Sequence, residues 1–476
     1  MGRVSILAGE HMGSPLPNNF LMPQLTTIIL AAGRGTRMKS AKPKILHEAG
    51  GLPLIAYPVG LAHSFKSNIV LVAPKKHTEI KKALKENFKG KMNYVVQDPP
   101  RGTGHAVMVA LPKIKGDGDV LVLCGDMPLV NHATIQTLLD EHRQKDAVMS
   151  FLTCITNGRQ EYGRVLRNLD GTPLRIIEAK DANEEQKKIR EMNAGVYVFN
   201  TSFLKQAIKE LSTNNVQKEY YLTDLVNVAG KLNRPVAVVC IHNEQEVLGV
   251  NSQIQLAEVE KNIYQQRCQR AMEQGIKILS PETVFIGPHV KLGQGITLFG
   301  PCYLQGKTTL GNNTVIEPGC WITDSKIGKG VHLKAYCYIS ESRLDENVTC
   351  GPFAHLRPGT VLKKGSKIGN FVETKKSTIG EGSKVNHLSY IGDAQVGKKV
   401  NIGAGTITCN YDGINKYKTV LENGVFVGSD TQFVAPVRVG KNAYIGAGST
   451  ITKNVKAGSL ALTRVPQREL PRWKKK

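Results

Sequence analysis

The feature that most constrains this chain is an apolar residue that recurs at every sixth position after Pro281. The first file of such residues is Ile286, Leu292, Leu298, Leu304, Leu310, Ile316 and Ile322. A second file lies two places earlier and comprises Val284, Val290, Ile296, Cys302, Thr308, Thr314 and Cys320. After a slip of one residue the period returns in Ile327, Leu333 and Ile339, then in Leu356, Leu362 and Ile368, and finally in Leu421, Val427, Phe433, Val439, Ile445 and Ile451.

A six-residue period predicts a β-helix, in which each short strand turns one side chain inward and stacked coils build a continuous apolar column. Glycines such as Gly293, Gly311 and Gly328 fit the corners of such coils. The period breaks between Thr408 and Leu421, where "CNYDGINKYKTV" is predicted to leave the helix as a projecting loop. Insertions of this kind often carry the function of a repeat protein.

The first half follows a different pattern. From Thr26 to about Asn251, strand-like runs such as "TTIIL", "NIVLVAP" and "DVLVLCGD" alternate with helix-like runs such as "HTEIKKALKENF". This alternation predicts an α/β domain with a mainly parallel sheet. Ligands of such sheets bind at the carboxyl ends of the strands. Asp126, the last residue of "DVLVLCGD", lies at such an end.

These patterns divide the chain into five segments. Residues 1–24 are an extension whose "GEHMGS" resembles the remnant of an expression tag, and residues 25–251 form the α/β domain. Residues 252–275 are predicted to be a linking helix, because Leu256, Val259 and Ile263 recur at helical spacing and Gly275 supplies a stop signal. Residues 276–456 form the β-helix domain and residues 457–476 a basic arm.

The charge balance indicates which classes of molecule the chain can bind. Lys and Arg number 63 against 39 Asp and Glu, a net charge of +24, which attracts polyanions. The basic residues are spread along the chain without the aromatic spacing of single-strand binders, so we expect phosphorylated small molecules and no nucleic acid. The nine cysteines form no CxxC pair, which indicates a reducing, cytoplasmic setting, and no apolar run reaches the ~20 residues of a membrane span.

The stretch "LAAGRGTRMKSAKPKILH", from Leu30 to His47, follows the first predicted strand. It lacks the Walker A pattern and the third glycine of a dinucleotide-binding fingerprint. Its glycines still allow backbone N–H groups to approach phosphate oxygens, and Arg37 and Lys44 can neutralise a polyphosphate.

In its context this loop resembles the sugar-nucleotidyltransferase signature L-x-x-G-x-G-T-x-M followed by P-K. Further matching stretches occur in the same order, among them "QDPPRGTGHA", "GDMPL", "MNAGVYVF", "GVNSQIQL", "GPFAHLRPG", "GNFVETKK", "HLSYIGDA", "NIGAGTITCNYDG" and "VFVGSDTQFVAPV". Almost the whole chain therefore resembles the bacterial family of bifunctional N-acetylglucosamine-1-phosphate uridyltransferase/glucosamine-1-phosphate acetyltransferase enzymes. The resemblance implies a Rossmann-like nucleotidyltransferase domain and a left-handed parallel β-helix of hexapeptide repeats.

For the first domain the resemblance implies a site for UTP and N-acetylglucosamine-1-phosphate. The matching nucleotide and sugar ligands are Leu30, Ala31, Ala32, Gly33, Arg37 and Lys44 for the phosphates and base region, Gln97, Gly102 and Thr103 for uracil, Gly163, Glu178 and Asn193 for the sugar, and Asn251. Asp126 and Asn251 match the residues that hold Mg²⁺, a hard cation that prefers oxygen ligands. Ala194 stands where the family usually has threonine, which is expected to alter the pocket near Asn193 slightly, and Cys124 lies at a variable position.

For the β-helix the resemblance implies acetyl transfer from acetyl-CoA to glucosamine-1-phosphate. His387 matches the general base, and Glu373 is a candidate for orienting it. Arg357, Lys375, Tyr390 and Asn401 match the sugar-phosphate ligands, and Lys418 belongs to the same polar set. The acetyl-CoA contacts match Ala404, Asn410, Tyr411, Ser429, Ala447 and Arg464. Members of this family are homotrimers whose second site is shared between neighbouring β-helices.

Two alternatives are open at this stage. Some sugar nucleotidyltransferases carry a β-helix for assembly only, so the chain could be monofunctional with a structural β-helix. The positive charge also permits a nucleic-acid-binding scaffold. The polar residues that interrupt the repeats favour the bifunctional enzyme, whose product would be UDP-N-acetylglucosamine, a precursor of cell-wall and envelope polysaccharides.

Overall fold

A computed structural model describes residues 24–33, 35–88, 90–156 and 161–470. These residues form two compact units. The first consists of the chain up to His47 together with Leu54–Asn251, and the second of Glu48–Pro53 together with the chain from Ser252 onward. Among the described residues, no helix has both the length and the apolar character needed to cross a bilayer.

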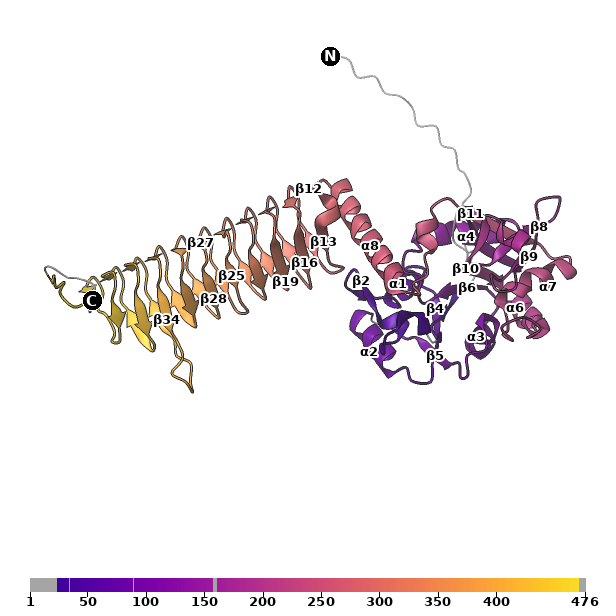
Figure 1. Cartoon of the computed structure of the whole chain (residues 1–476), viewed down its shortest axis with the longest axis horizontal. Coiled ribbons are helices and arrows are strands. Elements are labelled where there is room, and N and C mark those ends of the chain that lie inside the picture. Colours follow the sequence, from indigo (N-terminus) through magenta and orange to yellow (C-terminus); the bar gives the residue numbers. More distant parts are fainter. Residues whose placement is uncertain (1–23, 34, 89, 157–160, 471–476) are drawn as a thin grey trace, which may run out of the picture. The chain divides into compact units, whose positions relative to one another are not determined.

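The first unit is built on one mixed sheet in the order β11-β7-β10-β6-β1-β4-β5 (Figure 1). Strands β6, β1, β4 and β5 run parallel, as the sequence predicts, whereas β10 is antiparallel to both of its neighbours, and β8 and β9 add an antiparallel pair at its side. The strands are β1 (Thr26–Leu30), β4 (Asn68–Ala73), β5 (Asn93–Val96), β6 (Asp119–Cys124), β7 (Met149–Ile155), β8 (Arg164–Arg167), β9 (Pro173–Ile177), β10 (Glu191–Asn200) and β11 (Val236–Ile241).

Helices cover both faces of this sheet, which explains why its central strands are apolar on both sides. The helices are α1 (Ala56–Ser64), α2 (Thr78–Asn87), α3 (Thr103–Ala110), α4 (His132–Gln144), α5 (Glu184–Lys187), α6 (Thr201–Ala207) and α7 (Leu225–Lys231). Apolar residues of α3, α6 and α7 share one buried cluster with Ile28 and Val122 of the sheet, whereas those of α1 and α2 pack with Ile29 and Leu71. The odd and even residues of β1 thus face opposite helical layers.

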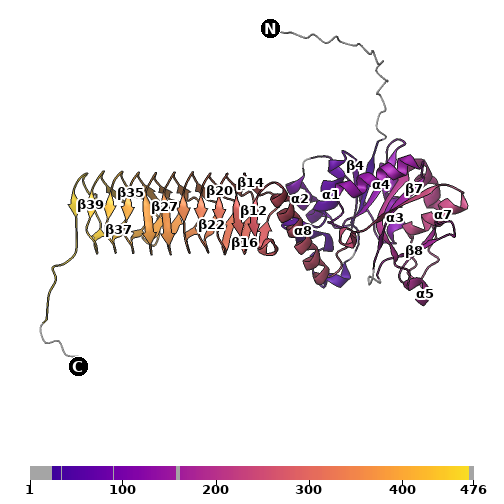
Figure 2. The same cartoon turned by 90° about the horizontal axis from the view of Figure 1, so that it is seen from above.

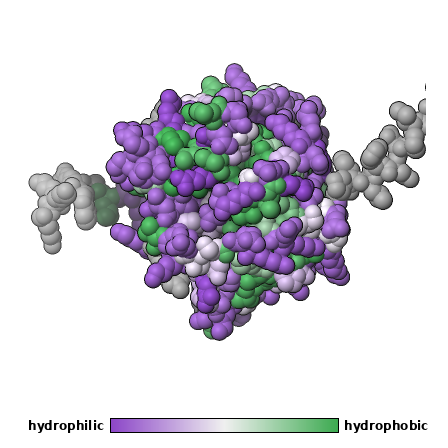
Figure 3. Space-filling view, turned by 90° about the vertical axis from the view of Figure 1, so that its right-hand side faces the viewer, coloured by the Kyte–Doolittle hydropathy of each residue, from purple (hydrophilic) through white to green (hydrophobic). Residues whose placement is uncertain are grey.

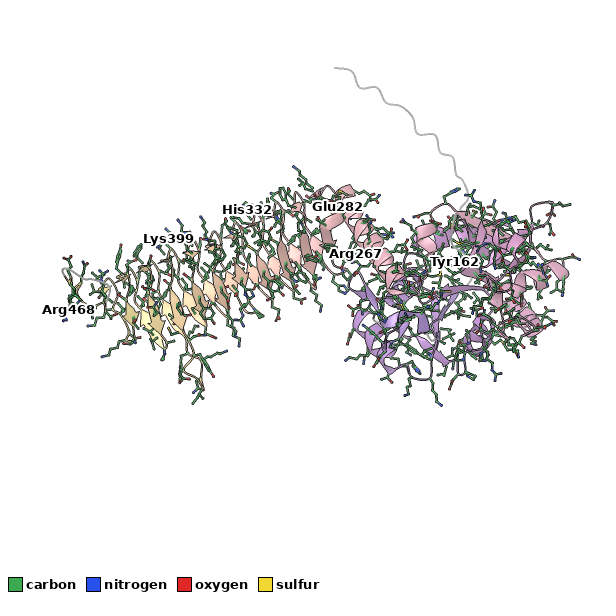
Figure 4. The ribbon with its side chains drawn as sticks, viewed as in Figure 1. Tyr162, Arg267, Glu282, His332, Lys399 and Arg468 are labelled. Carbon is green, nitrogen blue, oxygen red and sulfur yellow. The ribbon has the colours of Figure 1, made fainter. Side chains whose placement is uncertain are left out.

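Helix α8 (Gln253–Glu273) opens the second unit, and its N-terminus is capped by the Ser252 hydroxyl, which accepts a hydrogen bond from the Gln255 amide at 3.2 Å. The hairpin of β2 (Glu48–Ala49) and β3 (Leu52–Pro53) belongs to this unit as well. The Arg267 guanidinium, labelled in Figure 4, donates to the Gly50 carbonyl at 2.6 Å and to the Ile286 carbonyl at 3.0 Å. One arginine therefore ties the hairpin, α8 and the first coil together.

The rest of the second unit is a parallel β-helix with three faces, whose stacked rungs are seen in Figure 2. One sheet runs from β12 (Lys277–Leu279) to β41 (Leu460–Ala461), the second from β13 (Val284–Ile286) to β40 (Thr450–Ile451), and the third from β14 (Lys291–Leu292) to β38 (Val437–Val439). The predicted six-residue files point inward: Leu298, Leu304 and Ile316 are fully buried. Only Val290 and Leu292, in the first coil, are partly buried.

The predicted loop leaves the β-helix between β34 (Ile407–Cys409) and β35 (Thr419–Leu421), and it projects from the stack in Figure 1. An isolated antiparallel bridge between Tyr411 and Lys416 closes it. The surface of the molecule is mixed. On the face turned toward the viewer in Figure 3, hydrophobic patches are broken up by hydrophilic side chains.

Two candidate active sites

The first unit holds a cavity of about 540 Å³ at the edge where β1, β5 and β6 end. The parallel strands bring residues from distant parts of the sequence to this edge. Its lining includes nine predicted ligands, namely Leu30, Ala31, Ala32, Gly33, Lys44, Gln97, Gly102, Thr103 and Asp126. It also includes Ile45, Pro100, Ala106, Cys124 and Glu219, which the sequence did not single out.

The glycine-rich loop reaches the cavity because Gly35 leaves room for Lys44. Gly35 has a φ of +62°, and a Cβ atom there would lie 2.6 Å from the Cβ atom of Lys44. A larger residue would therefore push the lysine out of place. Arg37, in the short 3-10 helix η1 (Thr36–Met38), is exposed and is not among the residues that line the cavity.

Lys44 joins the two predicted metal ligands. Its ammonium forms an ion pair with Asp126, which follows β6, and donates to the Asn251 side-chain oxygen at 3.0 Å. In the sequence, Asp126 and Asn251 lie 82 and 207 positions from Lys44. One carboxylate and one amide oxygen thus converge on a single cationic group, and this donor set fits a magnesium ion whose other ligands are phosphates and water.

The three predicted uracil ligands, Gln97, Gly102 and Thr103, lie together in the lining of the cavity. The Gln97 side-chain Nε2 atom donates to the Gly102 carbonyl at 2.9 Å and lies 3.2 Å from His105 Nδ1. Gly102 has a φ of +96°, and a Cβ atom there would lie 2.6 Å from the Tyr220 carbonyl oxygen. The Thr103 hydroxyl accepts from the Leu222 amide at 3.0 Å, which fixes the start of α3.

The three predicted sugar ligands form a second cluster. The Asn193 amide donates to the Gly163 carbonyl at 2.9 Å, and a Cβ atom on Gly163 would lie 3.6 Å from the Glu178 Oε2 atom. Burial raises the pKa of Glu178, although a hydrogen bond from the Thr223 hydroxyl at 2.9 Å opposes this. Ala194 follows Asn193 in β10, and its side chain is buried.

Cys124 links the two clusters, a role that the sequence did not reveal. Its thiol is 3.5 Å from the Gly195 carbonyl oxygen, to which it donates, and it also lines the cavity. Burial raises the pKa of this thiol to about 12, and the charges of Asp126 and Glu178 add to the rise. The residue at the end of β6 is therefore a neutral thiol rather than a nucleophile.

In the second unit His387 ends β30 (Lys384–His387) and its ring is exposed. Its Nδ1 atom lies 2.6 Å from the Oδ1 atom of Asn370, which occupies the same position one coil earlier in β27 (Lys367–Asn370). An amide oxygen only accepts, so Nδ1 carries the proton and Nε2 presents its lone pair. This is the arrangement that a general base requires.

Within one chain Glu373 does not contact His387, so its orienting role stays a prediction. The Glu373 carboxylate instead pairs with Arg357 at 2.7 Å and lies 3.8 Å from His355 Nδ1. The cause is the coil register, which sets Glu373 opposite His355 and Tyr390 on the second face and sets His387 opposite Asn370 on the first. Glu373 therefore orients Arg357, and the expected Tyr390 ligand begins β31 (Tyr390–Gly392) directly beside it.

The remaining predicted residues lie at the ends of β-helix strands and in the projecting loop. Lys375 ends β28 (Glu373–Lys375), and the neighbouring ammonium of Lys416 lowers its pKa, so the loop lysine that faces Lys375 is Lys416 rather than Lys418. Asn410 donates to Asp393 at 2.5 Å at the base of the loop, and Tyr411 is exposed on it. Asn401 begins β33 (Asn401–Ile402).

The predicted acetyl-CoA contacts Ala404, Ser429 and Ala447 follow one another up a corner. The amides of Asp430 and Gly448 donate to the Ala404 and Ser429 carbonyls at 2.7 and 2.8 Å. The Arg464 guanidinium donates to the Ala447 carbonyl at 3.3 Å and so belongs to the same column. This corner also carries Leu388, whose carbonyl accepts from the Gly405 amide at 3.1 Å, and the column therefore starts beside His387.

Comparison with known proteins gives matches in both units. The MobA-like NTP transferase domain model matches residues 27–192, and the bacterial transferase hexapeptide model (six repeats) matches residues 418–453. The hexapeptide match agrees with the predicted left-handed β-helix.

Similar curated proteins extend over nearly the whole chain. A protein named "Bifunctional protein GlmU" from Carboxydothermus hydrogenoformans is 45% identical over 92% of this chain and 98% of its own length. Its namesake from Geotalea uraniireducens is 44% identical over 96% of this chain and 100% of its own length. A solved structure of a putative glucose-1-phosphate thymidylyltransferase from Bacillus anthracis covers 50% of this chain and 94% of that one, at 19% identity and a TM-score of 0.42, a likeness too weak to support an argument.

Proposed function

The chain belongs to the family of bifunctional GlmU proteins, and on this premise we propose that it makes UDP-N-acetylglucosamine in two steps. The second unit transfers an acetyl group from acetyl-CoA to glucosamine-1-phosphate. The first unit then couples the product to UTP and releases pyrophosphate. The observation that carries this proposal is that the relatives match along both units, each of which brings its own set of polar residues together.

Uridyl transfer joins two anions, so cationic groups carry much of the stabilisation. An oxygen of the sugar-1-phosphate attacks the α-phosphorus of UTP, and pyrophosphate leaves. This oxygen is already ionised, so the reaction needs no protein base. Lys44 and Arg37 are the side chains assigned to the triphosphate, and the backbone of Leu30, Ala31, Ala32 and Gly33 approaches the nucleotide closely.

Uracil recognition is assigned to Gln97, with Gly102 and Thr103. Since the Gln97 Nε2 atom already donates to the Gly102 carbonyl, its Oε1 atom is the group that accepts the N3–H of the base. A backbone amide at Gly102 supplies the complementary donor, because a residue with a side chain would collide with Tyr220. This division of donor and acceptor distinguishes uracil from cytosine.

Mg²⁺ is the metal that we propose for this site, with Asp126 and Asn251 as its protein ligands, since their oxygens converge on one point. When bound, the ion would neutralise phosphate charge at the reacting centre. Gly163, Glu178 and Asn193 are assigned to the sugar, and burial, which raises the pKa of Glu178, favours a carboxyl group that can donate to a hydroxyl.

Acetyl transfer is assigned to His387. The neutral imidazole takes a proton from the amino group of glucosamine-1-phosphate, whose nitrogen attacks the thioester carbonyl. The C–S bond then breaks, and the thiolate of coenzyme A leaves and receives this proton from the imidazolium. Asn370 holds the imidazole in the tautomer with Nε2 unprotonated. Arg357, Lys375, Tyr390 and Asn401 are assigned to the sugar phosphate, and Ala404, Asn410, Tyr411, Ser429, Ala447 and Arg464 to acetyl-CoA.

A homotrimer is the assembly that we propose for the β-helix. Four large apolar side chains support it, because they are about half exposed and lie at one corner with left-handed backbone, namely Tyr336, Phe353, Phe371 and Leu388. Such conformations cost free energy for bulky residues, and an exposed apolar row of this kind typically marks a contact surface. The row ends beside His387, so a neighbouring copy that covers it would also border the acetyl-transfer site.

The domain limits that we propose are residues 25–251 for uridyl transfer, 252–275 for the linking helix and 276–456 for acetyl transfer, with 1–24 and 457–476 outside them. The cytoplasm is the proposed compartment, which the nine cysteines support, since the structure joins none of them in a disulfide.

Assays with each substrate pair separate the proposal from its alternative. Acetyl-CoA with glucosamine-1-phosphate should release a free thiol, and UTP with N-acetylglucosamine-1-phosphate should release pyrophosphate when Mg²⁺ is present. A monofunctional enzyme with a structural β-helix would give pyrophosphate alone, and a chain that gives neither product would overturn the proposed function.

A further inference from the structure

The ammonium of Lys44 lies where the two proposed metal ligands converge. It pairs with the Asp126 carboxylate and is 3.0 Å from the Asn251 Oδ1 atom. The side chains of Lys44 and Asp126 are only 12% and 19% exposed, so water screens their charges poorly. A divalent cation that binds both oxygens must therefore take the place of this ammonium or lie against it.

The backbone that follows Lys44 is held in place by burial and hydrogen bonding. Ile45 and Leu46, the next two residues of η2 (Lys44–Leu46), are each 5% exposed. The Ile45 carbonyl accepts from the Ile55 amide at 3.1 Å, which anchors this turn to α1. The four-carbon chain of the lysine, by contrast, reaches across Gly35, where the missing side chain leaves space.

We propose that Lys44 competes with the divalent cation for Asp126 and Asn251, and that a bound polyphosphate relieves this competition by drawing the ammonium onto its own oxygens. This inference rests on the proposed uridyl transfer. It adds that binding of the polyphosphate frees the metal ligands for the cation. Without nucleotide, a cation at Asp126 would face a second positive charge a few ångströms away. With a nucleoside triphosphate, the ammonium gains phosphate partners and releases the carboxylate.

The consequence is a coupling between the two ligands. Nucleotide should tighten cation binding, and by linkage the cation should tighten nucleotide binding by the same factor. A lysine that served only as a phosphate ligand would contribute to nucleotide affinity and leave cation affinity of the free enzyme unchanged. The two roles therefore differ in a property that can be measured without turnover.

The test titrates Mn²⁺, followed by its EPR signal, into the full-length enzyme, with Mg²⁺ as a competitor. We expect Lys44→Met to bind Mn²⁺ about tenfold more tightly than the parent when no nucleotide is present. A non-hydrolysable UTP analogue should tighten Mn²⁺ binding to the parent and have a much smaller effect on Lys44→Met. Lys42→Met is the matched control, because it removes an exposed charge from the same loop and should bind Mn²⁺ like the parent.

Equal Mn²⁺ affinity of the parent and a folded Lys44→Met variant would overturn the inference. Acetyl transfer reports the folding of the second unit only, so circular dichroism and the thermal transition check the first. If Lys44→Met is unstable, Lys44→Gln provides the second test, since this polar side chain also removes the positive charge and should bind Mn²⁺ more tightly than the parent. A parent that shows the coupling but forms no pyrophosphate from UTP and sugar phosphate would overturn the proposed function instead.

Discussion

The Nδ1 atom of His387 lies 2.6 Å from the side-chain oxygen of Asn370, one coil earlier in the β-helix. A neutral acceptor fixes the tautomer without the stabilisation of the imidazolium form that a carboxylate would bring. His387 is therefore held ready to accept a proton at Nε2. This relationship gives two predictions, one for each partner.

Replacing His387 with alanine should lower acetyl transfer by roughly 10²–10⁴-fold, the usual contribution of a positioned base. Uridyl transfer should continue, because its residues lie in the other unit and its nucleophile is already ionised. Rates of thiol release and of pyrophosphate release measure the two activities. His387→Asn, which keeps more of the volume and polarity, guards against loss of packing. Acetylation at the parent rate by a folded variant would rule out the assignment.

Asn370→Asp should move the acidic limb of the acetyl-transfer pH profile to higher pH. The new carboxylate would favour the protonated imidazole, so a higher pH is needed to obtain the same fraction of free base. The profile of kcat against pH measures the shift. Asn347→Asp, at another corner of the β-helix, is the charge-matched control. An unchanged profile would mean that Asn370 does not contact the base during the reaction.

Asp126→Ala should abolish uridyl transfer and leave acetyl transfer near normal. The carboxylate is one of only two proposed protein ligands of the metal, and it also neutralises Lys44. Pyrophosphate release at increasing Mg²⁺ concentration would show whether excess metal restores activity. Equal loss of both activities in a folded protein would contradict the separation of the two sites.

Gly102→Ala should reduce uridyl transfer by about tenfold or more. The added methyl group would lie 2.6 Å from the Tyr220 carbonyl oxygen at a φ of +96°, so the backbone that borders Gln97 must shift. Small displacements of binding groups have large effects on rate. Gly230→Ala in α7, where no atom lies within 4 Å of the new methyl group, should leave the rate unchanged. Comparable rates for the two variants would argue against a role of this turn.

The free energy of unfolding should fall as the pH rises above about 9. Burial raises the pKa of Cys302 to about 12 from the ordinary thiol value of 9.0. Between these values the unfolded chain releases a proton that the folded one keeps, which destabilises the fold by about 1.4 kcal/mol per pH unit. Urea unfolding at pH 8 and pH 10 measures the loss, and Cys302→Ala should reduce it whereas Cys240→Ala, at an exposed site, should not.

The architecture was predictable because both of its signals are local. The six-residue files of the second unit and the strand and helix runs of the first are read from neighbouring residues, and both folds follow from burying them. The antiparallel direction of β10 has no such signal, because a strand has the same apolar pattern whichever way it runs.

Much of the candidate site was also named in advance, through matches to family motifs rather than through the physics of the chain. Nine of those residues line one cavity. Cys124 was assigned to a variable position and given no role, because a cysteine at the end of a strand has no motif of its own. Only its distance to the Gly195 carbonyl reveals its place between the two clusters.

The sequence by itself determined the repeat, the change of fold near residue 252 and the chemical types of the side chains at both sites. Tertiary structure alone decided which of them meet. Asn370 rather than Glu373 faces His387, because the coil register sets the partners on each face. Lys44 stands between Asp126 and Asn251, because parallel strands end at one edge of a sheet. The hairpin Glu48–Pro53 packs in the second unit, because Arg267 of α8 binds its backbone. Such contacts span tens to hundreds of residues, and packing rather than any local pattern selects them.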